Sequence, residues 1–214
     1  MKKFFAAIVL FFMTNNAAAQ GNSPEVDRGI ASVKQKKSAF NVETRFFSPN
    51  LNAKVKGDDF YFHRTEAPEF IIKYKNFSLD YIRSHDALNF VKLKMDREIF
   101  SMMGTGLEWN VALNAMDWRG TSAGTQNYFA VLPSVGINLY MRIRPRLDIY
   151  TQFSGSSFGR HGYFKDFESG IKYFPQKNFS ISAGWRRIDF KSRRGGDLGK
   201  FGLSGLFAGV RYDF

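Results

Sequence analysis

The chain has 214 residues, no cysteine, and a formal net charge of +12, from 31 Lys and Arg against 19 Asp and Glu. The lack of cysteine excludes a disulfide-stapled secreted domain, and it excludes a lipoprotein because that lipid is attached to a cysteine. Aromatic residues make up 17% of the chain, yet the mean hydropathy is −0.30. This combination is typical of transmembrane β-strands, in which lipid-facing and lumen-facing side chains alternate and average to near neutrality.

Residues 1–19 have the pattern of a secretory signal peptide. Lys2 and Lys3 precede an apolar stretch over residues 4–13, and residues 17–19 are all Ala, so we expect cleavage near Ala19. The ten apolar residues are about half of the roughly 20 that a membrane-spanning helix needs. Without this segment the net charge falls from +12 to +10. Export argues against the nucleic-acid partner that a basic chain otherwise suggests.

Residues 20–37 are predicted to form a polar tail that ends in a basic run containing Lys34, Lys36 and Lys37. Ser23 and Pro24 suit the N-cap and first turn of a short helix. Two interpretations stay open: a solvated periplasmic tail, or a short helix whose lysines face lipid headgroups.

From residue 38 to residue 214 the pattern changes to an alternation of apolar and polar residues, punctuated by turns, which predicts a single β-domain. Ten strands are expected, over residues 39–48, 69–75, 77–84, 89–99, 107–116, 127–142, 146–153, 167–174, 178–190 and 203–214. Eight strands are the alternative if 77–84 and 89–99 do not both cross the membrane. Pro133 cannot donate to a strand ladder, so it is expected to mark a bulge or the end of membrane-embedded pairing.

The connections between these strands come in two sizes. Those near residues 75–76, 144–145 and 175–177 are tight, whereas 50–67, 117–126, 154–165 and 191–200 are long and polar. Outer-membrane barrels have short periplasmic turns and long extracellular loops, and an even strand number places both ends of the barrel in the periplasm.

The last strand carries an apolar stripe that ends in an aromatic residue. Leu206, Ala208, Val210, Tyr212 and Phe214 lie on one face. This stripe resembles the C-terminal signal of Gram-negative outer-membrane proteins, and the resemblance implies that the barrel-assembly machinery reads it. The size and strand plan resemble the small OmpA-, OmpX- and OmpW-type barrels. We therefore expect a closed antiparallel up-and-down transmembrane β-barrel in the cell outer membrane, of undetermined oligomeric state.

If the apolar faces meet lipid, the opposite faces place six acids and six bases in the lumen. A barrel of eight or ten strands has little interior space, and buried charges must be paired. We therefore expect a closed network of ion pairs rather than an open pore. Its predicted members are Glu43, Arg45, Lys73, Asp80, Glu108, Arg142, Asp148, Glu168, Lys172, Arg186, Arg211 and Asp213.

The excess positive charge falls in the tail and in the presumed outer segments. Arginine and lysine at the outer rim would pair with the phosphates of lipopolysaccharide, and solvated loop charge is the alternative. The candidates for this contact are Arg160, His161, Lys191, Arg193, Arg194 and Lys200.

No residue pattern predicts a catalytic, metal or cofactor site. Ser84, His85 and Asp86 are consecutive, and consecutive residues of a strand point to opposite faces. His161, with Ser154 upstream, is the best candidate for a lipid-modifying site but is interpreted as a solvated loop residue. Aromatic girdles at the two interfaces are expected from Trp109, Trp118, Trp185, Tyr128, Tyr140, Tyr150, Tyr163, Tyr173 and Tyr212.

The leading prediction is a non-enzymatic integral outer-membrane protein with a structural or surface-interaction role. Passage of small or hydrophobic solutes is the first alternative, and a lipid-modifying enzyme is the second.

Overall fold

The computed structural model describes residues 39–56, 58–84, 88–102, 104–119, 127–194 and 197–214. The predicted signal peptide and tail, with its short helix, lie outside these residues. No helix among the described residues is long and apolar enough to cross a membrane.

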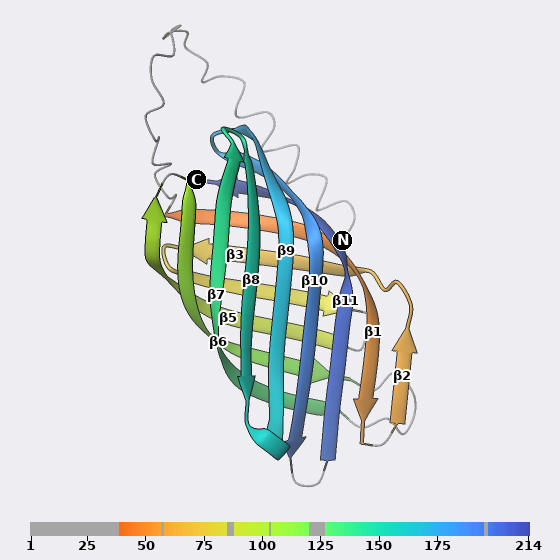
Figure 1. Cartoon of the computed structure of the whole chain (residues 1–214). Coiled ribbons are helices and arrows are strands. Elements are labelled where there is room, and N and C mark those ends of the chain that lie inside the picture. Colours follow the sequence, from red (N-terminus) through yellow and green to blue (C-terminus); the bar gives the residue numbers. More distant parts are fainter. Residues whose placement is uncertain (1–38, 57, 85–87, 103, 120–126, 195–196) are drawn as a thin grey trace, which may run out of the picture. The chain divides into compact units, whose positions relative to one another are not determined.

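The described residues form eleven β-strands in one antiparallel sheet (Figure 1). The last strand pairs with the first, from Asn41 opposite Asp213 to Val55 opposite Gly199, and this pairing closes the sheet into a barrel. A single 3-10 turn, η1 (Gly159–His161), connects the eighth and ninth strands. The strands are β1 (Phe40–Val55), β2 (Asp58–Phe62), β3 (Ala67–Tyr74), β4 (Phe77–Ser84), β5 (Leu88–Met102), β6 (Thr105–Trp118), β7 (Tyr128–Arg144), β8 (Leu147–Ser157), β9 (Gly162–Gln176), β10 (Phe179–Arg194) and β11 (Asp197–Asp213).

The short strands β2 and β3 together occupy one position beside β1. β2 pairs with the end of β1 at Val55, and β3 pairs with its beginning at Phe40. At the break between them, the Thr65 N–H and hydroxyl both donate to the Pro49 carbonyl. The described strands therefore fill ten positions around the barrel. The prediction of ten strands is confirmed, and the alternative of eight is excluded.

The strands are longer than predicted at one end of the barrel. We call this end the loop end, and the opposite end, which holds the tight turns near residues 75, 145 and 177, the turn end. The predicted loops over 50–67, 154–165 and 191–200 are mostly strand, so these predictions were wrong. The polar residues of these three segments suggested loops. In the structure these polar residues alternate with fully buried residues, such as Leu51 and Phe164, as they do in strands.

Pro133 marks the end of pairing on one side of β7. The β7–β8 ladder stops at Val135 opposite Gly155, whereas the β6–β7 ladder continues past Pro133 as far as Trp118 opposite Tyr128. The β6–β7 ladder has no register shift at Pro133, so the structure shows no bulge there.

The inward faces of the strands change from charged to apolar along the barrel. β1 shows the change in one strand: Glu43 and Arg45 point inward near the turn end, and Phe47, Leu51 and Val55 point inward toward the loop end. All five side chains are at most 9% exposed, so both halves of the interior are filled.

The outward faces change in the opposite sense. β10 presents Ile181 and Trp185 near the turn end, followed by Arg187, Lys191 and Arg193 toward the loop end. The outer face of β10 thus has the polarity of a transmembrane strand near the turn end and that of a water-soluble strand near the loop end, whereas β7 presents Phe129 and Val131 outward near the loop end. Because charged outward residues are costly in lipid, we expect the loop-end part of β10 to lie beyond the hydrocarbon layer.

Candidate functional site

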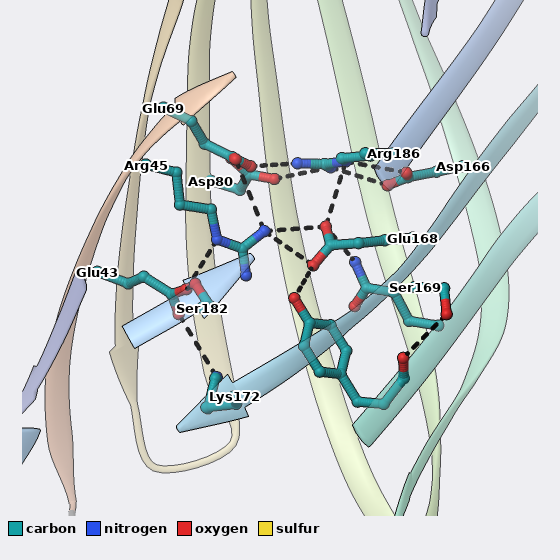
Figure 2. A network of polar contacts seen from close by, with 12 residues as sticks. Glu43, Arg45, Glu69, Asp80, Asp166, Glu168, Ser169, Lys172, Ser182 and Arg186 are labelled. Atoms are coloured by element: carbon teal, nitrogen blue, oxygen red, sulfur yellow. Dashed lines mark hydrogen bonds and ion pairs between the residues drawn. The ribbon is translucent and has the colours of Figure 1, made fainter. Parts of the chain in front are cut away.

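A buried cation, Arg186 on β10, lies at the centre of the barrel interior (Figure 2). Its Nε and Nη2 donate to the two Asp166 carboxylate oxygens over 3.1 and 2.9 Å, and Nη2 also donates to Asp80 Oδ2 over 3.0 Å. Nη1 donates to Glu69, and Glu168 Oε2 lies 3.5 Å from Nε. Carboxylates from β3, β4 and β9 therefore converge on one guanidinium.

A second cation, Arg45 on β1, extends this cluster. Its Nε donates to Glu43 over 2.8 Å, and its Nη1 donates to both Glu168 oxygens over 2.8 and 2.9 Å. Nη1 also lies 3.6 Å from Glu69 Oε2, which joins the two arginines through one carboxylate. The Tyr150 hydroxyl donates to Glu168 over 2.8 Å. These shared acids make one network (Figure 2).

The network spans the lumen rather than following the wall. The Lys92 ammonium on β5 donates to Asp166 on β9 over 2.8 Å and to Ser154 over 3.0 Å. β5 and β9 are four positions apart in a ten-position barrel, so this contact passes through the interior. Arg186 and Asp80 are also four positions apart. Such buried pairs replace water in the lumen.

A smaller group of charges lies nearer the turn end. Asp96 on β5 accepts from Lys73 over 3.0 Å, lies 3.2 Å from the Lys94 ammonium, and accepts from Asn138 over 3.0 Å. These contacts connect β3, β5 and β7. The interior therefore carries paired charge at more than one level along the axis.

The predicted lumen residues divide into three groups. Glu43, Arg45, Asp80, Glu168, Lys172 and Arg186 lie in the central network, where Lys172 is 3.8 Å from Glu43. Lys73 and Glu108 lie near Asn138 in the turn-end group, with Glu108 accepting from Asn138 over 3.5 Å. The remaining four form two local, partly exposed pairs, Arg142 with Asp148 and Arg211 with Asp213.

Sequence reasoning missed five charged members of the two networks. Asp166 was missed because it adjoins a segment predicted as loop. It lies two residues from Glu168 and six from Lys172, so all three share one face of the strand. The other four belong to strands with a weak alternation, in which charged residues on the inward face obscured the pattern. They are Glu69, Lys92, Lys94 and Asp96.

An apolar plug fills the interior on the loop-end side of this network. Its aromatic rings are in contact across the barrel, from Phe90 to Phe164, Phe190, Phe201 and Trp118, with centroids 5.6 to 6.4 Å apart. All five side chains are at most 1% exposed. The plug and the network are in direct contact, because the Arg45 guanidinium lies 4.7 Å from the centre of the ring of Phe207, another buried residue of the same apolar cluster.

The plug corrects the prediction of aromatic girdles. Trp118 and Tyr128 are buried inside the barrel, and the Tyr128 hydroxyl donates to the Ser192 carbonyl over 2.7 Å. Tyr150 faces the ion-pair network instead of lipid. The apolar inward face of the loop-end half explains the error, since the prediction assumed that every aromatic residue near a strand end faces outward. Trp109, Trp185 and Tyr173 are exposed on the outer surface.

The residues predicted to contact lipopolysaccharide lie at the loop end. Arg160 and His161 are exposed in η1, and Arg193 and Lys200 are exposed on β10 and β11. Lys191 is half-buried on β10. The side chain of Arg194 lies outside the described part of the chain.

In the two serine–histidine combinations, the described serine hydroxyls contact partners other than histidine. Ser84 is fully buried and its hydroxyl lies 3.1 Å from that of Thr65, whereas His85 and Asp86 lie outside the described residues. Ser154 points into the lumen and accepts from Lys92, and His161 is exposed in η1.

No family model and no curated protein matches this sequence. Solved structures do match it. The outer membrane protease OmpT from Escherichia coli aligns with a TM-score of 0.55 at 10% identity, over 84% of this chain and 98% of that chain. The N-terminal β-barrel domain of Pseudomonas aeruginosa OprF aligns with a TM-score of 0.35 at 11% identity, over 80% and 97%. At such identities the likeness concerns the fold alone, which is that of the small outer-membrane β-barrels.

Proposed function

We propose that this protein is a non-conducting outer-membrane barrel with a structural or surface-interaction role. Its signal peptide, residues 1–19, directs export, and its loop end faces the cell exterior. There its basic outer surface contacts lipopolysaccharide. The proposal includes no catalytic step and no cofactor.

The filled interior is the observation that carries this proposal. A solute entering from the turn end meets Arg186, Arg45 and their carboxylates, all at most 9% exposed. A solute entering from the loop end meets the ring contacts of the apolar plug. Opening either layer would expose buried groups that stabilise the barrel. A closed interior favours a structural role over passage along the barrel axis.

The distribution of charge supports the part of the proposal that concerns lipopolysaccharide. The interior networks pair their cations with acids. Exposed cations lie at both ends of the barrel, and those at the loop end include Arg160, Lys165, Arg187, Arg193 and Lys200. Phosphate groups on the outer leaflet are the anions that such a surface would meet.

The outward stripe of β11 supports a second partner, the barrel-assembly machinery. Leu206, Ala208 and Val210 are exposed on the outer face, and Phe214 is 53% exposed beside Phe40. A strand with an apolar outer face and free backbone groups before closure suits templated pairing.

Two measurements on the purified barrel test the proposed function. In liposome-swelling assays with sugars of graded size, we expect no uptake above that of empty vesicles, and concentration-dependent uptake would overturn the closed-barrel part. In titrations with lipopolysaccharide in detergent, we expect saturable binding that weakens with salt. Absence of binding at low ionic strength would overturn the proposed contact between the outer surface and lipopolysaccharide.

A further inference from the structure

Three lysines from three adjacent strands form a continuous row on the outer surface near the loop end. In the pairing of β10 with β11, Lys191 is directly opposite Lys200. In the pairing of β11 with β1, Lys200 is directly opposite Lys54. The neighbouring inward residues Val55, Phe190 and Phe201 are buried, so the alternation of the strands points the lysines outward. We call Lys54, Lys191 and Lys200 the lysine row.

The lysine row places like charges directly opposite one another on neighbouring strands, an arrangement that sheets normally avoid. Directly opposite residues of antiparallel strands have Cβ atoms about 4.5–5.5 Å apart, and like charges there destabilise the pairing. Within the described part of the chain only Lys54 has an acidic partner, Asp59, at 3.1 Å, and both side chains of that pair are largely exposed. Lys191 and Lys200 have none there. An external anion would remove this repulsion.

The surface around the row is also basic. Lys165, Arg187 and Arg193 point outward on β9 and β10 close to the row. The acid nearest to them, Asp189, accepts from Arg187 Nε over 2.7 Å. Among the described side chains named here, six bases and the two acids Asp59 and Asp189 give a formal charge of +4.

Two small outward residues of β11 lie directly below the row, toward the turn end, and we call them the seat. The next outward residues of β11 are Gly202 and Ser204, which are smaller than the side chains on either side of them. A Cβ added at Gly202 would meet Asp189 Oδ1 at 3.3 Å, a tight contact with a carboxylate that already accepts from Arg187. The small residues of the seat leave the lysine row accessible from its turn-end side.

An apolar surface begins immediately below the seat. Leu206, the next outward residue of β11, is 69% exposed, and Trp185 is directly opposite it on β10. The Trp185 ring packs against Phe167 of β9, with centroids 5.8 Å apart. Cationic, small and apolar side chains thus follow one another along a single stretch of the outer wall.

We propose that the lysine row and its seat bind a phosphate of the lipid A headgroup of lipopolysaccharide, with an acyl chain of the same molecule lying along Leu206 and Trp185. This inference rests on the proposed surface function and assigns it to one site. A nucleic acid or a free phosphate would use the cations alone, whereas the contiguous apolar surface requires a ligand with both an anionic head and an apolar tail. The position of the row, just beyond the apolar band, is where lipid headgroups lie.

The test is a titration of the folded full-length barrel in neutral detergent with bisphosphorylated lipid A, followed by native mass spectrometry. The triple variant Lys54→Gln, Lys191→Gln, Lys200→Gln removes the row, and Lys177→Gln removes one exposed lysine from a tight turn at the opposite end as a matched control. At about fivefold per lysine, the triple variant should bind on the order of a hundredfold more weakly, and the control should bind as the native protein does.

Two further arms identify the ligand chemistry. Gly202→Leu should fill the seat without changing charge and weaken binding at least tenfold. Dephosphorylated lipid A should bind as weakly as the triple variant does, and inorganic phosphate at millimolar concentration should not compete. Effective competition by inorganic phosphate would overturn the lipid assignment and leave a simple anion site.

The failures of the two proposals are distinguishable. If the triple variant binds lipid A as strongly as the native barrel does, this site is overturned and the proposed surface function stands. Native barrel that binds no lipid A at all would overturn both.

Discussion

Arg186 and Asp80 stand on opposite walls of the barrel, on β10 and β4, and the Arg186 Nη2 donates to Asp80 Oδ2 over 3.0 Å. The same guanidinium holds Asp166 and Glu69. Removing it would leave three buried carboxylates without their main cation, whereas the next residue, Arg187, points outward and is largely exposed. Adjacent residues of one strand therefore allow a matched comparison.

Arg186→Met should lower the free energy of unfolding by about 3–5 kcal/mol, because it leaves buried charge uncompensated. Arg187→Met removes only an exposed pair with Asp189 and should change stability by less than about 1 kcal/mol. Urea unfolding in detergent micelles, followed by tryptophan fluorescence, measures both. Equal effects of the two substitutions would show that the network does not stabilise the barrel.

The apolar plug predicts a stability cost at the loop end that a purely membrane-embedded barrel would lack. Phe190 is fully buried between Phe164 and Phe201, so Phe190→Ala should cost about 3–5 kcal/mol through lost contacts and a cavity. Leu206→Ala, at a 69% exposed outward position, is the control and should cost much less. The same unfolding assay measures both variants. A small change in the free energy of unfolding for Phe190→Ala would mean that the rings pack loosely.

The reversal of polarity along the outer wall predicts where the membrane ends. Ile137, an exposed residue of β7 in the apolar band, should not accept arginine: Ile137→Arg should cost about 2–4 kcal/mol in lipid bilayers. Asn52→Arg, on the outer face of β1 near the lysine row, should be close to neutral. Folding titrations in phospholipid vesicles compare the two. Similar costs would place both positions at the same depth and contradict a projecting loop-end half.

Phe214 combines an exposed ring with contacts to Phe40 and Tyr212, at centroid distances of 5.2 and 4.9 Å. If the assembly machinery reads this residue, Phe214→Ala should reduce the folded fraction in the outer membrane several-fold. Phe153→Ala, which removes another exposed outward phenylalanine, should not. Heat-modifiable migration of membrane fractions on gels measures the folded fraction. An equal loss in both variants would indicate general destabilisation instead of a lost signal.

The sequence alone predicted the fold correctly because alternation is a local property. Residues two apart on a strand share a face, so Arg186 and Glu168 could be assigned to the lumen without knowledge of the sheet. The prediction failed for Trp118 and Tyr128, since it assumed that aromatic residues near strand ends face the membrane interface. A reversal of face polarity near the middle of the barrel leaves the alternation itself unchanged.

The sites could be predicted only in part, for a different reason. Lys92 pairs with Asp166 across the lumen, and such partners depend on strand number and on the register of every intervening pair. The lysine row depends on closure, because Lys54 meets Lys200 only where the first strand pairs with the last. Composition indicated basic outer segments, but the three-dimensional register was needed to bring three of their lysines together.

The closed lumen is the central claim, and single-channel recording in planar bilayers tests it most directly. The native barrel, inserted at single-molecule density and verified as folded, should give no conductance steps over the full voltage range, while a general porin in the same bilayer does. Reproducible, stepwise conductance from the native barrel would contradict a lumen filled by the Arg186 network and the apolar plug.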